Sequence, residues 1–375
     1  MSTLKNALKK FRRFYYMYRE FVKLKDDRNR LLKVAEKSFA DELPKQGSLA
    51  DYKRALFRHG VSYKEYMYCY KFWKLGEKQR AEFISERAMR CIYRKTVQPS
   101  VAMMFRNKVS ALEFFKLFVH RKWMYPKTES FESFVTFVNS MDCLAKPIKG
   151  SLGMGIVLIN KDDNNDLEEL YKRFCENDYV IEERLNGCKE MQEFHPQSLN
   201  TLRVFTVTNN GRSGLVSAMM RVGVGDSIID NASAGGIVAC VDIETGVVCG
   251  DGADKLGNTY VVHPESGKAF KGFVIPHWTD VVDTCKKMSS VVHELVFAGW
   301  DICVLQNGTV ELVEVNSTSN MSGLQTASGK GIKPRLRDVG KEVLGYDPVK
   351  LASVWSKSYV KYNDKYGQYD LIRLK

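Results

Sequence analysis

Residues 309–317 read Thr-Val-Glu-Leu-Val-Glu-Val-Asn-Ser, and the rest of the fold can be worked out from this stretch. Successive side chains of a strand point to opposite faces of its sheet. The pattern therefore predicts that Glu314 and Asn316 share one face, with Leu312 in line with them. Asn307-Gly308, just before the strand, is a hairpin turn signal and predicts an antiparallel partner strand.

The predicted hairpin brings three oxygen donors together. Asp301 lies at the expected start of the first strand, and Glu314 and Asn316 lie in the second. Two carboxylates and an amide oxygen form a hard ligand set, which suits Mg²⁺ better than zinc. The same residues are also consistent with a hairpin whose acidic side chains are merely solvated. The hairpin alone does not separate these two interpretations.

Length and composition indicate a globular protein with a large core. The chain has 375 residues, of which 44% are hydrophobic, and more than one domain is expected. It contains no uninterrupted run of 18 apolar residues, so no transmembrane helix is predicted. The first residues lack the apolar core of a signal peptide, and the nine cysteines include no CxxC pair. These features predict a cytoplasmic protein with reduced thiols.

The positive charge is concentrated at the start of the chain. The net charge is +13, and residues 1–37 alone, with twelve Lys/Arg and four Asp/Glu, carry +8. Such local basicity argues against a nucleic-acid partner, which needs a broad positive face. Apolar side chains recur there at three- and four-residue spacing, which predicts a helix. The favoured interpretation is a helix packed on its own protein; the alternative is a peripheral contact with the inner face of a membrane.

The order of the expected elements predicts an α+β protein. Residues 1–99 are expected to form a basic, aromatic-rich helical region, and 346–375 a C-terminal tail. The main domain is expected over 100–345, with subdomains over about 142–184 and about 200–325. Strands are expected over 142–147, 154–160, 178–184, 201–209, 214–221, 236–243, 300–305 and 309–315, and helices over 108–120, 165–176 and 279–297.

A glycine-rich loop lies between two expected strands. Lys146 ends the first strand, and the loop that follows contains Gly150, Ser151, Gly153 and Gly155. Glycines let backbone N–H groups approach phosphate oxygens closely, and the lysine can place an ammonium group beside them. The loop is not a Walker motif, because no Gly-Lys-Ser/Thr follows and the next element is a strand. It predicts a hairpin that closes over a triphosphate; the alternative is a mobile surface hairpin.

The strand over 178–184 ends in Glu182 and Glu183. An apolar strand that ends in two carboxylates suits a hinge, where backbone groups meet the edge of an adenine base and an acid lies nearby. The same pattern also suits a strand that leaves the core.

Taken together, these features resemble the ATP-grasp superfamily. The residues that carry the resemblance follow in order over 100–325: Lys108, Lys146, the glycine loop, Glu182-Glu183, Arg203, the loop Asp230–Gly236, Asp301, Glu314 and Asn316. The chain is most similar to the sugar-transfer-associated ATP-grasp family, and this resemblance spans nearly the full length. Its marks are the helical aromatic N-terminal region, Asn200-Thr-Leu-Arg203, Asp230-Asn231 with Gly235-Gly236, His263-Pro-Glu-Ser-Gly and Ile275-Pro-His277-Trp278.

The resemblance implies two α+β subdomains that clasp ATP, with a helical region before them. It implies nucleotide contacts at Lys108, Lys146, the glycine loop, the hinge Glu182-Glu183, the ribose acid Glu190 and Arg203. It also implies two Mg²⁺ ions held by Asp301, Glu314 and Asn316, and catalytic roles for Arg203 and Arg221.

The implied activity is an ATP-dependent carboxylate–amine ligase that forms an amide through an acyl phosphate. Its expected substrates are small molecules, such as a uronic acid or amino sugar and an amino acid, in polysaccharide or sugar-conjugate biosynthesis. The alternatives are a peptide-tailoring ligase of the same superfamily and an ATP-grasp kinase that phosphorylates a hydroxyl group. The sequence names neither the acid, the amine nor the oligomeric state.

Overall fold

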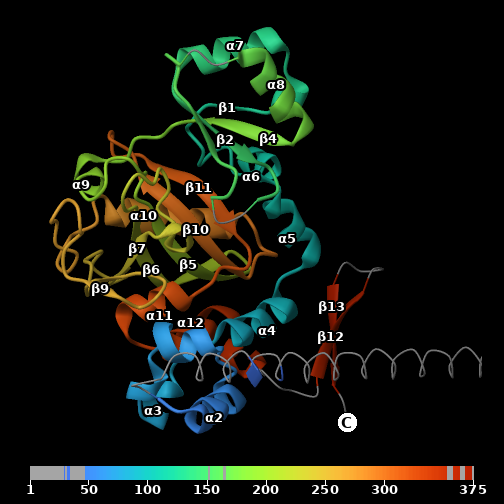
Figure 1. Cartoon of the computed structure of the whole chain (residues 1–375). Coiled ribbons are helices and arrows are strands. Elements are labelled where there is room, and N and C mark those ends of the chain that lie inside the picture. The colour runs from blue at the N-terminus through green and yellow to red at the C-terminus, as the bar shows by residue number, and fades with distance from the viewer. Residues whose placement is uncertain are drawn as a thin grey trace, which may run out of the picture.

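The computed structural model describes residues 47–150, 153–163, 166–352, 358–363 and 368–373, together with Asn29, Leu32 and Lys33. This part of the chain forms a larger body with a smaller lobe on top and a group of helices below (Figure 1). The predicted α+β class is confirmed, whereas the helix expected over residues 3–37 falls almost wholly outside the described residues. Within the described ranges, no helix is both long and apolar enough to span a membrane.

The helices below the body are short: α2 (Leu49–His59), α3 (Glu77–Arg80) and α4 (Glu86–Thr96), with a π-helical turn at Glu65–Cys69 and a 3-10 turn at Phe72–Lys74. Helix α5 (Pro99–Arg106) continues from them beside the body (Figure 1). Ser48 caps α2 by accepting from the backbone N–H of Asp51 at 3.1 Å. Tyr52, Tyr66 and Phe72 are fully buried, so the aromatic stretch of this region is a core and not a base-stacking surface.

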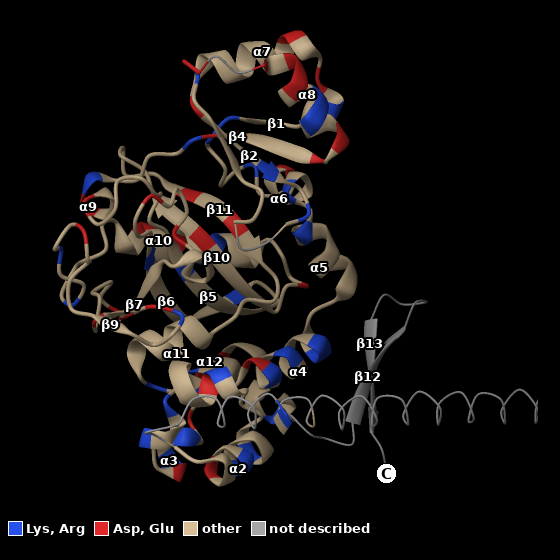
Figure 2. Cartoon of the chain, in the orientation of Figure 1, with Lys and Arg blue, Asp and Glu red and all other residues tan. Residues whose placement is uncertain are grey.

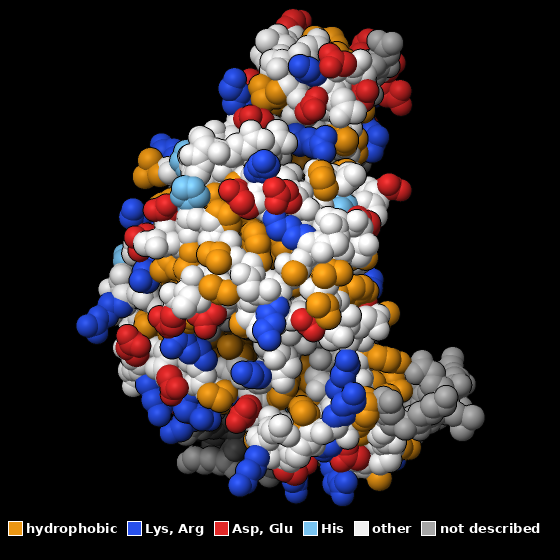
Figure 3. All heavy atoms as spheres, turned by 90° about the vertical axis from the view of Figure 1, so that its left-hand side faces the viewer, with side chains coloured by type: hydrophobic (Ala, Val, Ile, Leu, Met, Phe, Trp, Pro, Cys, Tyr) orange, Lys and Arg blue, Asp and Glu red, His pale blue; other side chains and the backbone are white. Residues whose placement is uncertain are grey.

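The smaller lobe is a four-stranded antiparallel sheet covered by two helices. Its strand order is β1-β4-β2-β3. The bounds are β1 (Trp123–Met124), β2 (Cys143–Pro147), β3 (Val157–Ile159) and β4 (Tyr179–Glu183), with α7 (Phe131–Ser140), α8 (Leu167–Glu176) and a 3-10 turn at Pro126–Thr128. Phe134 of α7 and Phe174 of α8 are fully buried against the sheet residue Ile181. The lobe projects from the body, and charged side chains of both signs cover it (Figure 3).

The body is built on a seven-stranded antiparallel sheet in the order β11-β10-β5-β6-β7-β8-β9. The strands are β5 (Leu202–Asn209), β6 (Arg212–Val222), β7 (Ile237–Val241), β8 (Gly252–Ala253), β9 (Thr259–Tyr260), β10 (Phe297–Val304) and β11 (Val310–Asn316). Its helices are α6 (Lys108–Phe114), α9 (Lys189–Gln192), α10 (Trp278–Ser290), α11 (Ser322–Ser328) and α12 (Lys333–Leu344), with 3-10 turns at Ala232–Ala234 and Pro348–Leu351. Helices α10 and α12 both contact β5 and β6, and α11 contacts β7. Strands β12 (Ser358–Asn363) and β13 (Gln368–Arg373) form a separate hairpin.

Two predicted helix ends differ from those in the structure. The helix expected over 279–297 ends at Ser290, because Phe297 and the residues after it join β10 and pair with β5. Asp301 is therefore central in its strand and not at the start, with β5 on one side and β11 on the other. The helix that begins at Lys108 ends at Phe114 and not near residue 120.

A β-bulge in the hairpin changes which side chains share a face. Asp301 is opposite Glu314, but the next residue, Ile302, is opposite Leu312, so Val313 has no partner in the ladder. Leu312 therefore lies on the core face with Ile302, and not in line with Glu314 as the alternation predicts. The same shift brings Glu311 onto the face of Glu314.

Candidate active site

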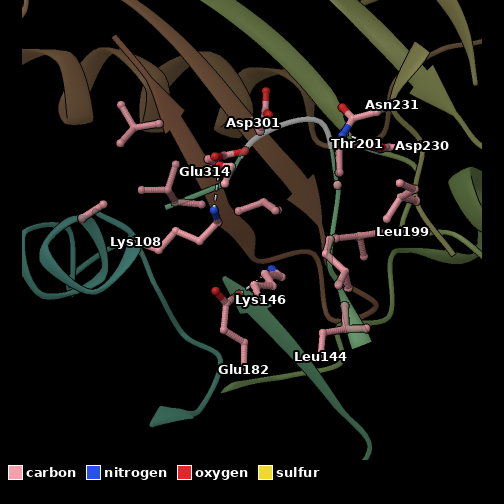
Figure 4. Close-up of a pocket in the computed structure, with 18 of the residues that line it drawn as sticks. Lys108, Leu144, Lys146, Glu182, Leu199, Thr201, Asp230, Asn231, Asp301 and Glu314 are labelled. Carbon is pink, nitrogen blue, oxygen red and sulfur yellow. Dashed lines mark hydrogen bonds and ion pairs between the residues drawn. The ribbon is translucent and has the colours of Figure 1, made fainter. Parts of the chain in front are cut away.

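A cleft lies between the smaller lobe and the edge of the body's sheet. Charged side chains from both sides point into it (Figure 4). Lys108 comes from α6, Lys146 from β2 and Glu182 from β4, whereas Asp301 and Glu314 come from β10 and β11. The structure therefore brings these five predicted site residues together in one cavity.

On the side of the smaller lobe, Glu182 is held by two cations. Its Oε2 accepts from the Nζ of Lys146 and from the Nε of Arg121, each at 2.7 Å. Arg121 also donates to Oε1 of Glu311 at 2.6 Å, so it ties β4 to β11 across the base of the cleft. Burial raises the pKa of Glu182, but Arg121 and Lys146 outweigh it and lower this pKa to about 2.

On the floor of the cleft and directly behind it, charges of opposite sign alternate. Arg203 donates from Nε and Nη2 to both oxygens of Asp301, the latter at 2.7 Å, and Nη1 of Arg221 lies 3.1 Å from Oδ2 of Asp301. Asp230 lies beyond Arg221 and accepts from the backbone N–H and the hydroxyl of Thr201. Burial raises the pKa of Asp301, but the two arginines outweigh it and keep this pKa below its usual value. Asp301 is thus ionised, and the two arginines already balance its negative charge.

Glu314 differs from Asp301 in having no partner. Among the described residues it makes no hydrogen bond or ion pair, although its side chain is open to the solvent in the cleft. Surrounding protein and the nearby Asp301 carboxylate raise the pKa of Glu314. Asn316 does not line the cleft, but its Nδ2 lies 3.3 Å from Oδ2 of Asp301. The described residues contain no group of three His, Cys, Asp or Glu side chains that could hold a metal ion.

Lys108 and the glycine hairpin form the opposite wall. The Nζ of Lys108 donates to the backbone oxygens of Pro147 and Gly150, each at 3.1 Å, and burial lowers its pKa. Gly150 and Gly153 line the cleft, whereas Gly155 packs behind it against Pro147. Ser151, also predicted as a nucleotide contact, lies outside the described residues.

The two predicted hinge acids and the ribose acid lie in different places. Glu183 lines a hollow that continues the cleft and shares Lys146 and Glu182 with it. Glu190 does not reach either space; it sits on α9 in another hollow, beside His277 and the β10–β11 turn. The backbone N–H of Cys188 donates to the oxygen of Val304 at 2.7 Å, which draws α9 toward that turn.

Arg203 lies behind the cleft and does not line it. Its guanidinium is turned to Asp301 and Ser319, to which it donates hydrogen bonds. Arg221, in contrast, lines the cleft at the end of β6 and donates to Asn231 of the Asp230–Gly236 loop. Sequence reasoning missed Arg121, which has no motif of its own. Its only signal is a basic residue at the edge of an apolar segment.

Comparisons with known proteins place these observations in context. No curated protein sequence matches the chain. Similar solved structures include the ATP-grasp ligase PsnB with its minimal precursor, Mg and ADP, at 14% identity over 68% of this chain and 62% of that chain, with a TM-score of 0.41. An L-amino acid ligase from Bacillus licheniformis matches at 11% identity over 65% of this chain and 48% of that chain, with a TM-score of 0.37.

N5-carboxyaminoimidazole synthase from Aspergillus clavatus, in complex with ADP and 5-aminoimidazole ribonucleotide, matches at 11% identity over 60% of this chain and 47% of that chain, with a TM-score of 0.37. The chain thus spans less than two thirds of each of these proteins. The model of one family matches residues 113–341, which is more than half of the chain and includes the elements of the cleft other than α5 and most of α6, so Lys108 lies outside the match. The chain belongs to the sugar-transfer associated ATP-grasp family.

Proposed function

We propose that this protein is an ATP-dependent carboxylate–amine ligase that forms an amide through an acyl phosphate. One observation carries the proposal beyond family membership. Lys108 and Lys146 face Glu314 and the paired Asp301 across a single cleft. The two lysines could bind the triphosphate of ATP, and the two carboxylates on the opposite side could bind its divalent metal ion. The loop that follows β2 borders the same space through Gly150 and Gly153.

The triphosphate would bind against the lysines. Lys108 is held toward the glycine hairpin by two carbonyl oxygens, which satisfy two of its three donors and leave one for a phosphate. Lys146 shares Glu182 with Arg121, so it can offer its remaining donors without leaving that carboxylate uncompensated. The continuing hollow beside Glu183 would take the base and the ribose.

The donor set fits a divalent cation at Glu314. An unpartnered carboxylate next to a second carboxylate is an electrostatic arrangement that a bound cation relieves. Glu314 would be the principal ligand, with Asp301 and Asn316 beside it; Asp301 shares its charge with Arg203 and Arg221. Bound Mg²⁺ neutralises phosphate charge and so reduces the repulsion between two anions that react.

The chemistry follows from where charge develops. The substrate carboxylate attacks the γ-phosphorus of ATP, the bond to the bridging oxygen of ADP breaks, and an acyl phosphate forms. An amine then attacks the acyl carbon, and phosphate leaves from the tetrahedral intermediate as the amine loses a proton. Arg221 lines the cleft, where Asp301, Thr201 and Asn231 hold its guanidinium, and its positive charge would stabilise the oxyanion of that intermediate. Arg203, which does not reach the cleft, would act by holding Asp301 in place.

The substrate class rests on the family's association with sugar transfer. A uronic acid or amino sugar joined to an amino acid, in polysaccharide or sugar-conjugate biosynthesis, fits both the reaction and this association. A cytoplasmic location fits a supply of ATP.

The test is to incubate the purified protein with ATP and Mg²⁺ against panels of acids and amines, and to follow ADP, phosphate and amide. Equal amounts of ADP, free phosphate and amide are expected for one acid–amine pair. Lys146→Met should reduce turnover at least tenfold, whereas the exposed Lys172→Met should not. ADP production at the background rate with every pair would refute the ligase. A stable phosphoester in place of an amide would identify a kinase instead, and an amide formed only with peptides would identify a peptide-tailoring ligase.

A further inference from the structure

A further hollow, of about 490 Å³, lies beside the cleft, on the side of the lower helices. Its walls are α4, α5 and residues 318–320, the loop that follows β11. This hollow contains three arginines, and α4 stands out in Figure 2 as a helix rich in Lys and Arg. None of its lining residues takes part in the nucleotide contacts or the cation site described above.

The hollow and the cleft are adjacent spaces that share two walls. On α5, Phe105 lines the cleft, whereas Met103 and Arg106 line the hollow. On the other wall, Glu314 borders the cleft and Ser319, five residues later, borders the hollow. A ligand in the hollow would therefore lie next to the end of the cleft where the cation site is found.

Ser319 connects the hollow to the floor of the cleft. Its hydroxyl accepts from Nη1 of Arg203 at 2.8 Å, and Arg203 in turn holds Asp301. The hydroxyl of Tyr93, on α4, donates to the backbone oxygen of Ser319 at 2.5 Å. The shared wall is thus fixed from both sides, and the two spaces keep a defined relation to each other.

The hollow carries uncompensated positive charge. Arg90 is paired with Glu86 one helical turn before it, and both line the hollow. Arg94 and Arg106 are exposed, and among the residues that the structure describes neither has an ion-pair or hydrogen-bond partner. Guanidinium groups bind phosphate oxygens in a bidentate manner, and each of the two carries a full charge. Two free charges match a phosphate monoester or a diphosphate better than a single carboxylate.

The rest of the lining is apolar. Met103 exposes 69% of its surface, an unusual fraction for a large hydrophobic residue, and it stands beside Arg106. Met89, Val97, Pro99 and Ala102 line the same space. Methionine adapts its shape to ring faces and to short chains. The hollow thus combines an anion-binding end with a surface that can pack against a sugar ring.

We propose that this hollow binds the phosphate-bearing part of one co-substrate, which is a sugar phosphate ester. The proposal rests on the proposed ligase, because it places that co-substrate beside the reacting end of the cleft. The ester is either soluble or carried on a lipid as a sugar diphosphate. The two sources share the charge that Arg94 and Arg106 would recognise.

The experiment measures binding by calorimetry to full-length protein saturated with Mg²⁺ and a non-hydrolysable ATP analogue. The probes are N-acetylglucosamine 1-phosphate, farnesyl-diphosphate-linked N-acetylglucosamine, and free N-acetylglucosamine as the uncharged comparison. We expect at least one phosphate ester to bind ten times more tightly than the free sugar. Its affinity should fall at least tenfold in the R94A/R106A double variant, and the tighter of the two esters identifies the source.

The matched control is R212A/K172A, which removes two exposed positive charges elsewhere and should bind as the unaltered protein does. R94Q/R106Q, whose fold is checked by its thermal midpoint, replaces the alanine variant if that variant unfolds. The proposal is overturned if neither ester binds more tightly than the free sugar, or if the double variant binds them equally well. Loss of analogue binding in the unaltered protein would instead count against the ATP-dependent function, and the ester affinities could then still be compared in the absence of nucleotide.

Discussion

The guanidinium of Arg121 lies 2.7 Å from Glu182 on one side and 2.6 Å from Glu311 on the other, and all three side chains are buried. Glu182 belongs to the sheet of the smaller lobe, and Glu311 belongs to the sheet of the body. One arginine therefore holds together the two layers that form the cleft. Its remaining donors reach the backbone oxygens of Leu312 and Val313, at the β-bulge.

Replacing Arg121 should destabilise the protein strongly. Arg121→Met leaves two buried carboxylates without their cation, and breaking a buried pair in this way costs about 3–5 kcal/mol. The free energy of unfolding, measured in urea, should fall by that amount. Arg54→Met removes an exposed arginine and should change it by less than about 1 kcal/mol. An Arg121→Met protein as stable as the control would show that the three charges do not hold the lobes together.

The pair of Asp51 and Arg80 should make the helical region sensitive to acid. Arg80 donates to both oxygens of Asp51, at 2.7 and 2.9 Å, and chiefly this contact lowers the pKa of Asp51 to about 2. Because the folded pKa is below the unfolded value, the contribution is complete above about pH 5 and is lost as the pH falls from about 4 to 2. Asp51→Asn should lower the free energy of unfolding by about 2 kcal/mol at pH 7 and by progressively less in acid.

Urea unfolding at pH 7, 4 and 3 checks this expectation. The control is Asp226→Asn, an exposed aspartate without an ion pair among the described residues, which should track the unaltered protein at each pH. A difference between Asp51→Asn and the unaltered protein that is constant across this range would contradict the expected linkage.

Glu314→Gln should separate activity from stability. Among the described residues the Glu314 carboxylate makes no hydrogen bond or ion pair, and burial and the Asp301 carboxylate together outweigh its attraction to Lys108, Arg203 and Lys146, so neutralising it removes a net unfavourable charge. We expect the thermal midpoint to stay the same or rise, while binding of Mn²⁺, followed by electron paramagnetic resonance, and ATP turnover fall at least tenfold. Glu168→Gln, on the exposed side of α8, should change neither the midpoint nor the binding. Unaltered Mn²⁺ affinity in Glu314→Gln would exclude this residue as the principal ligand.

Two neighbouring glycines should differ in their effect on the cleft. A Cβ atom at Gly236 would lie 2.4 Å from the backbone oxygen of Asp230, so alanine there must displace the Asp230–Gly236 loop. At Gly235 a Cβ would meet open space, and alanine would cost only the strain of φ +105°, about 1–3 kcal/mol. Both variants should be less stable, but only Gly236→Ala should also raise the KM for ATP severalfold. Equal KM values in steady-state assays would show that this loop does not shape the site.

Much of the site was predictable because it depends on short-range patterns. The strand bearing Lys146, the glycines after it and the strand bearing Glu182 all fall within about two residues of their expected places. These elements follow from alternation and turn chemistry, which a local window of sequence contains. The oxygen donors at Asp301 and Glu314 were identified for the same reason, and the structure does place them opposite each other.

Other features could not be seen in any local window. Arg121 meets Glu311 across 190 residues of chain, and the sequence around it contains no signal for that partner. Glu190 was assigned to the ribose by its position in the order of motifs, yet α9 turns toward the β10–β11 hairpin.

The residue types along the chain thus settle which segments are strands, where glycines permit close approach and which side chains can hold phosphates or a hard cation. Three features arise only when β5, β6, β10 and β11 pack side by side. They are the bulge at Val313, the pairing of Asp301 with two arginines, and the lack of a hydrogen bond or ion pair at Glu314 among the described residues. The reason is physical: alternation and turns are properties of neighbouring residues, whereas register and charge pairing depend on which distant strands share a sheet.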